Sequence, residues 1–147
     1  MALKPDRVEH LTDLSFFMNA IATRGQIVTH STEGSGASMD DSSAVVIVAT
    51  GTGDLAAGLL LNDVVSLDLT RQHINFAKDE VQAGSKVLLL RRGTVVTDNL
   101  AGTAAAGAKA YFDSSAKITS VAGSQQIGRF LSKEDADGYA KVEINIV

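Results

Sequence analysis

The chain has 147 residues, a formal net charge of −4 and no cysteine, so it can use neither disulfides nor thiolate chemistry. Its length suits a single domain. The mildly acidic balance argues against binding to bare nucleic acid, which requires clustered Lys and Arg. No apolar run approaches the roughly 20 residues that span a bilayer, and the first residues lack the apolar core of a secretory leader. We therefore expect a protein made in the cytoplasm with no membrane partner.

Residues 1–25 are predicted to form an N-terminal arm or a short helix. Apolar side chains recur there at spacings of three and four residues, at Leu11, Leu14, Met18 and Ile21. That spacing is typical of one face of a helix, and Gly25 would end it. The alternative is an extended arm, because the apolar cluster 16–18 could anchor in a neighbouring subunit as well as in the core of its own chain.

Residues 26–147 are predicted to form one β-rich domain. It begins with a strand at 26–30, which runs into the small, polar segment 31–43 with its two glycines. Such a segment buries too little apolar surface to offset the entropy of ordering it, so we expect a mobile loop. Long loops within compact domains are often functional, which makes 31–43 a candidate for contacts with a partner.

Further strands are predicted in the middle of the chain. The β-branched run 44–49 is apolar on both faces, as in a strand covered on both sides. Alternating apolar and polar residues predict strands at 64–69 and 72–77. In contrast, 99–108 consists mostly of small residues and contains two glycines, so a helix there would have little to pack with and we expect a loop.

The last third of the chain, 86–147, indicates the fold class. Short apolar runs recur there at intervals of roughly ten residues, each closed by glycine or a small polar cluster, as in antiparallel sandwiches and barrels. The clearest run is 140–146, in which four apolar residues alternate with Lys141, Glu143 and Asn145. A side-chain period of two places these sets on opposite faces of a strand. We therefore predict a mainly β protein, a compact antiparallel β-barrel or sandwich.

The same region resembles a known family of viral proteins. The segments that carry the resemblance are Lys86-Val-Leu-Leu-Leu-Arg-Arg-Gly-Thr-Val-Val, Ala108-Lys-Ala-Tyr-Phe-Asp, Lys117-Ile-Thr, Ile127-Gly-Arg-Phe-Leu and Asp137-Gly-Tyr-Ala-Lys-Val-Glu-Ile. Together they resemble the small β-rich capsid decoration (cement) proteins of tailed phages. The segment 64–80, which contains Leu69-Thr-Arg-Gln-His-Ile-Asn-Phe, is similar to cement proteins of podovirus-type cyanophages. The match is a pattern of strand and turn residues over about half of the chain.

The resemblance implies a virion structural protein on the outer surface of the assembled capsid. There it would cement neighbouring copies of the major capsid protein, and it would act as a homotrimer. Our hypothesis is that the N-terminal segment and the 31–43 loop make the capsid contacts, through Phe16, Phe17, Met18, Ile21, Gly34, Gly36 and Met39. For the cluster 16–18, ordinary core packing is the competing interpretation.

No motif in the sequence predicts catalysis, a cofactor or a metal site. His10, His30 and His73 are widely separated, with no second ligand at helix or hairpin spacing. The glycine-rich stretches 33–37 and 50–54 are not followed by the Lys of a phosphate-binding loop. Neighbouring carboxylates such as those at 134–137 lie in polar turns, where they are usually solvated. We therefore predict a protein that is not an enzyme.

A binding module of another class is the alternative function. Tyr111 and Tyr139, with nearby Asp and Asn side chains, could form a stacking and hydrogen-bonding platform for a carbohydrate or another small ligand. Aromatic residues make up only 5% of the chain, which disfavours this alternative.

Overall fold

A computed structural model describes residues 3, 7–30, 45–51, 53–64, 80–81 and 86–146. Within these ranges the chain forms strands and no helix, which confirms the predicted mainly β fold. The strands are β1 (Val8–Met18), β2 (Ala22–Thr23), β3 (Ile27–His30), β4 (Val45–Val48), β5 (Ala56–Val64), β6 (Glu80–Val81), β7 (Lys86–Thr97), β8 (Leu100–Ala101), β9 (Lys109–Phe112), β10 (Ile118–Thr119), β11 (Gly128–Phe130) and β12 (Ala140–Asn145).

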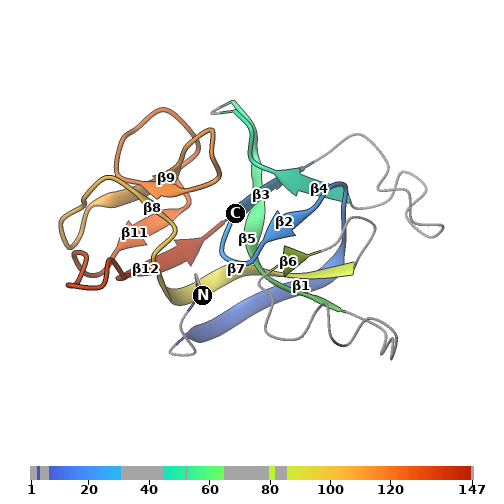
Figure 1. Cartoon of the computed structure of the whole chain (residues 1–147), viewed down its shortest axis with the longest axis horizontal. Coiled ribbons are helices and arrows are strands. Elements are labelled where there is room, and N and C mark those ends of the chain that lie inside the picture. The colour runs from blue at the N-terminus through green and yellow to red at the C-terminus, as the bar shows by residue number, and fades with distance from the viewer. Residues whose placement is uncertain are drawn as a thin grey trace.

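Ten of the strands share one curled, mixed sheet, in the order β1-β4-β3-β5-β7-β12-β11-β9-β10-β8. Because β1 also pairs with β7, the strands β1, β4, β3, β5 and β7 close into a barrel-like ring. The other five strands continue from the far half of β7, and we call them the outer sheet (Figure 1). β2 and β6 form a separate two-stranded sheet.

Most neighbouring strands are antiparallel, as predicted, but two contacts are parallel. One is the pairing of β10 with β8 at the end of the outer sheet. The other joins β1 to β4 through the pairs Phe17–Val45 and Met18–Val46, and it completes the ring. The sheet is therefore mixed, and a segment from the start of the chain holds the ring together.

The long strand β7 connects the ring to the outer sheet. On one edge its residues 86–90 pair with β5 and its residues 92–97 pair with β12, while the other edge pairs with β1. The register with β1 skips Arg91, and such a bulge bends a strand. Just beyond it, a side chain at Gly93 would collide with the backbone oxygen of Val8. The close approach of β1 thus depends on glycine at this position.

Two buried clusters stabilise the sheet. One consists of side chains from β1, β2, β3, β5, β6 and β7, including Phe16, Met18, Val87 and Leu89. The larger one joins the ring to the outer sheet and includes Ile27 and Leu90 as well as Phe112. In β12 the burial alternates as predicted, with the apolar residues buried and Lys141, Glu143 and Asn145 exposed.

The prediction of a helix near residues 11–21 is wrong, because Val8–Met18 is the strand β1. The apolar spacing that suggested a helix does not correspond to burial, since Leu11 is 50% and Ile21 61% exposed. Among the side chains described there, Phe16 and Met18 are buried, two residues apart, as expected for a strand. The alternative of an extended segment agrees with the backbone, but this segment pairs with β7 and β4 within the main sheet.

Two predicted features lie outside the described residues. They are the loop at 31–43 and the strand at 72–77, together with all but the first residue of the strand predicted at 64–69. The loop predicted at 99–108 is confirmed for residues 102–108, while β8 occupies its beginning.

Candidate docking face

Five neighbouring strands present one exposed face of the sheet. Residues paired directly across strands point to the same side, so the register aligns Lys109, Arg129, Glu143, Thr94 and Val8 in one row from β9 to β1. A second row contains Asn145, Arg92 and Leu11. Both rows lie opposite the buried side chains of β12. We call this surface the docking face.

Positive charge predominates on the docking face. The exposed residues Lys109, Arg129, Lys141 and Arg92 surround a single carboxylate, Glu143, among the strand residues that the structure describes there. This excess contrasts with the net charge of −4 for the whole chain. Residues 86–147 contain eight Lys and Arg against six Asp and Glu, whereas residues 1–85 contain five against eleven. The basic side chains are therefore concentrated in the part of the chain that builds the outer sheet.

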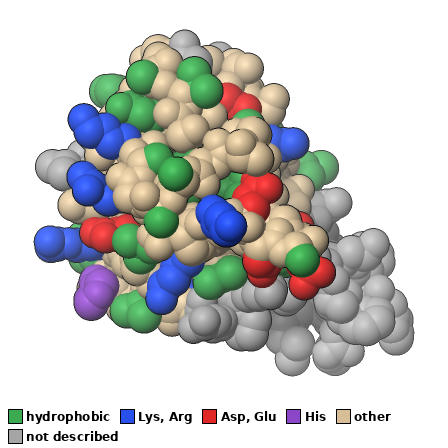
Figure 2. Space-filling view, turned by 90° about the vertical axis from the view of Figure 1, so that its left-hand side faces the viewer, with side chains coloured by type: hydrophobic (Ala, Val, Ile, Leu, Met, Phe, Trp, Pro, Cys, Tyr) green, Lys and Arg blue, Asp and Glu red, His purple; other side chains and the backbone are tan. Residues whose placement is uncertain are grey.

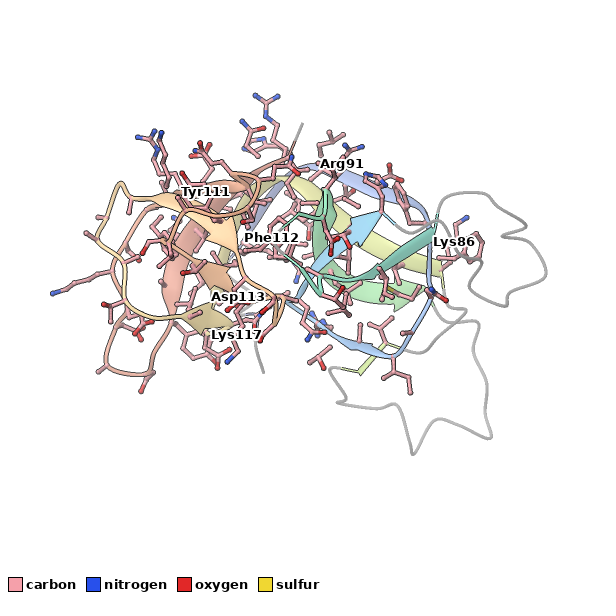
Figure 3. All side chains as sticks on the ribbon, turned by 90° about the horizontal axis from the view of Figure 1, so that it is seen from above. Lys86, Arg91, Tyr111, Phe112, Asp113 and Lys117 are labelled. Atoms are coloured by element: carbon pink, nitrogen blue, oxygen red, sulfur yellow. The ribbon has the colours of Figure 1, made fainter. Side chains whose placement is uncertain are left out.

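The figures show the same grouping. Figure 2 views the end of the molecule that carries the outer sheet, and Lys and Arg side chains gather along its left-hand margin beside apolar groups. In Figure 3, nitrogen-tipped side chains rise along the upper margin, on the same side as Tyr111. Phe112, the next residue of β9, is buried, and Asp113 and Lys117 lie toward the other margin.

Exposed apolar side chains lie on the β1 edge of the docking face. Val8 is 48% and Leu11 50% exposed, and each is paired across the strands with a residue of β7. Tyr111 on β9 is half-buried. Exposed apolar side chains that share a surface with Arg and Tyr are typical of protein–protein interfaces. The docking face therefore combines charged side chains with apolar surface whose burial in a complex would be favourable.

A groove of about 660 Å³ opens between residues of β1, β7 and β12. Its lining includes His10, Leu11, Arg92, Gly93 and Glu143. The charged groups could form hydrogen bonds and ion pairs with a side chain that enters from a partner. In the described part of the chain, no three His, Cys, Asp or Glu side chains are grouped closely enough to hold a metal ion.

The residues predicted to contact a capsid are not brought together at this face. Phe16 is 9% exposed and Met18 fully buried, and both pack in the core against Val87 and Leu89, as in the competing interpretation. Phe17 is half-buried, and of the predicted residues that the structure describes only Ile21 is largely exposed. Gly34, Gly36 and Met39 lie outside the described residues. Sequence reasoning missed the docking face, although the alternation of Lys141, Glu143 and Asn145 indicated the exposed side of its central strand, β12.

The alternative of a carbohydrate platform receives little support from the two tyrosines. Tyr111 and Tyr139 are both half-buried. The neighbouring carboxylates are engaged in turns: Asp113 Oδ1 accepts hydrogen bonds of 2.9 Å from the backbone N–H groups of Ser115 and Lys117. Asp135 Oδ1 likewise accepts bonds of 2.9 and 3.0 Å from the N–H groups of residues 137 and 139.

Comparison with known proteins gives no match to a family model or to a curated protein. In the described ranges, no helix could cross a membrane. Inference about function therefore depends on the pattern of the sequence and on the surface that the fold presents.

Proposed function

We propose that this protein is a virion structural protein that binds the outer surface of an assembled capsid and cements neighbouring copies of the major capsid protein. The proposal is supported by the resemblance of its strand and turn segments to phage decoration proteins. The structural observation that supports it best is the docking face, a broad exposed sheet surface that combines Arg, Lys and apolar side chains. Such a surface suits binding to another macromolecule.

The physical mechanism is linkage between binding and assembly. A ligand that binds the assembled shell, and not its dissociated subunits, stabilises the shell by RT ln(1 + [L]/Kd), which is about 2.7 kcal/mol per site at a hundredfold excess over Kd. Many sites on one shell multiply this effect. As a homotrimer, the protein would bind through three linked modules, so that each contact raises the effective concentration of the next. This action requires no cofactor and no chemical step.

The test is co-expression with the major capsid protein encoded in the same genome, followed by sedimentation of the shells through sucrose. The protein should sediment with assembled shells at a fixed ratio to the capsid protein, and these shells should withstand heating better than bare shells. Unassembled capsid protein serves as the control and should not bind. Recovery of the protein only in the soluble fraction, alongside well-formed shells, would reject the proposal.

A further inference from the structure

We infer that the docking face is the surface through which this protein binds, and that it recognises a carboxylate-rich protein surface. That this surface belongs to a capsid rests on the proposed function. The preference for carboxylates follows from the residues of the docking face. Phe16 and Met18 take no part in this contact, because their side chains are buried in the core.

The first argument is electrostatic. Among the strand residues that the structure describes on this face, there are four exposed cations and one exposed carboxylate, whereas the whole chain has a net charge of −4. Such a distribution orients the molecule so that this face meets an acidic surface first, and it repels other acidic copies approaching elsewhere. Complementary charge of this kind determines partner choice and association rate more than it determines final affinity.

The second argument concerns which polyanion the face fits. Glu143 lies between Arg129 and Thr94 in the row across the strands, where it would repel a phosphate backbone lying along the cations. A protein partner can instead place a Lys, Arg or hydroxyl opposite this carboxylate and its own carboxylates opposite Arg129 and Lys109. Val8 and Leu11 also provide apolar surface, which a sugar–phosphate backbone cannot cover favourably. The face therefore favours an acidic protein surface over nucleic acid.

The third argument is size. The row from Lys109 to Val8 crosses five adjacent strands, and strands lie about 4.8 Å apart, so it extends about 19 Å. The groove that contains His10 and Arg92 overlaps this row, because Thr94 and Glu143 also line it. A sheet surface of this width that includes a groove is large enough to form the centre of a protein–protein interface.

The experiment uses two double variants of the full chain with the same change in net charge. K109E/R129E reverses two cations on the docking face. K86E/K117E is the matched control, because both lysines are exposed and Figure 3 places them away from Tyr111, at the far end of β7 and on the opposite margin. Circular dichroism melts of both variants should match the native chain, which checks that each one folds. K109Q/R129Q offers a milder change if K109E/R129E fails to fold.

The binding probe is immobilised poly-L-glutamate, with single-stranded DNA of equal charge as the comparison. The native chain and K86E/K117E should bind poly-L-glutamate equally, and K109E/R129E should bind at least about tenfold more weakly. Binding should weaken as salt rises from 0.1 to 1 M, because the Debye length falls from about 10 to about 3 Å. Equal loss in both variants, no binding by the native chain, or tighter binding to DNA would overturn the inference.

The same variants on purified capsid shells separate this inference from the proposed function. If the native chain and the control bind shells and K109E/R129E does not, both are supported. If all three bind shells equally, the protein is a capsid-binding protein that docks through another surface. If none binds shells while the poly-L-glutamate result holds, the proposed function fails, and the inference that the docking face binds carboxylates stands.

Discussion

Two turns of the outer sheet have the same local structure and different surroundings. Residues 113–117 connect β9 to β10, and residues 135–139 precede β12. In each turn the first residue is an Asp whose Oδ1 accepts N–H bonds from the third and fifth residues. The backbone bonds match as well, since Asp113 N–H donates to the Lys117 carbonyl at 3.0 Å and Asp135 N–H to the Tyr139 carbonyl at 2.9 Å. The fourth residue of each has positive φ.

The turns differ in the residue that adopts this conformation. In the solvent-exposed turn it is Gly138, with φ of 84°, and no other atom lies within 4 Å of where its Cβ would be. In the other turn it is Ala116, with φ of 62°, and its methyl group is fully buried between the ring and the outer sheet. Its carbonyl accepts bonds from Ile27 N–H at 3.2 Å and from the Asn99 side chain at 3.1 Å.

The comparison shows that aspartate chemistry forms the turn and that tertiary contact determines which residue can occupy its strained position. An alanine at positive φ is unfavourable by about 1 kcal/mol relative to glycine. At residue 116 the buried methyl group and the two bonds to its carbonyl compensate for that strain. The turn at 113–117 therefore attaches the outer sheet to the ring, whereas the turn at 135–139 serves only its own hairpin.

The largest effect is expected from Asn99→Asp, because Asn99 links the turn at 113–117 to the ring. Asn99 Nδ2 donates to the carbonyls of Gly25 and Ala116, at 3.0 and 3.1 Å. A carboxylate there would face two carbonyl oxygens without a proton to donate, so we expect a loss of about 3 kcal/mol in unfolding free energy, measured by urea titration. Asn99→Ala should lose less, about 2 kcal/mol, because it only leaves the acceptors unpaired. An Asn99→Asp chain as stable as the native one would contradict this role.

Next in size are the paired changes Asp113→Ala and Asp135→Ala. Each removes an acceptor of two backbone N–H groups, but only the first turn is docked against β3. We expect losses of about 2 kcal/mol for Asp113→Ala and about 1 kcal/mol for Asp135→Ala in thermal or urea unfolding. The corresponding Asn variants, which keep the acceptor oxygen, should recover much of both losses. If the two Ala variants lose equal stability, the attachment of the first turn contributes nothing.

Gly138→Ala tests the strain of a positive φ at the fourth residue of the turn, without any change in packing. Because open space surrounds the added methyl group, the backbone conformation is the only penalty, and we expect about 1 kcal/mol of destabilisation. The measurement is the shift in the midpoint of urea unfolding at constant slope. An unchanged midpoint would show that this turn adjusts its φ freely.

The smallest effect is predicted for Ala116→Gly. Relief of strain of about 1 kcal/mol should be offset by the loss of one buried methyl group, worth about 0.8 kcal/mol, and by the greater freedom of glycine in the unfolded chain. The unfolding free energy should therefore stay within about 0.5 kcal/mol of the native value. A clear gain in stability, equal and opposite to the loss in Gly138→Ala, would mean that the buried methyl group contributes little.

Part of this architecture could be predicted from local sequence. The alternation in 140–146 predicts β12 with the correct buried face, and the evenly spaced apolar runs predict a mainly β protein. For the docking face, the sequence predicted only the exposed side of one strand, β12. Lys109, Arg129, Glu143 and Thr94 come from four strands distant in sequence, and only the register brings them into one row.

Pairing between distant segments also explains why the helix predicted near residues 11–21 is wrong. The spacing of Leu11, Met18 and Ile21 fits a helix, yet β1 is a strand because β7 offers it backbone partners along most of its length. The side chains available for local packing cannot outweigh a ladder of hydrogen bonds that exists only once the sheet has formed.

The sequence by itself determined the β class, the inward face of β12 and the polar turn at 134–137, because side-chain alternation and turn chemistry act over a few residues. Tertiary structure alone decided that β1 joins the ring, that an alanine occupies the strained position at 116, and that scattered cations share one face. These features depend on pairing and packing between segments far apart in the chain, which no local pattern encodes.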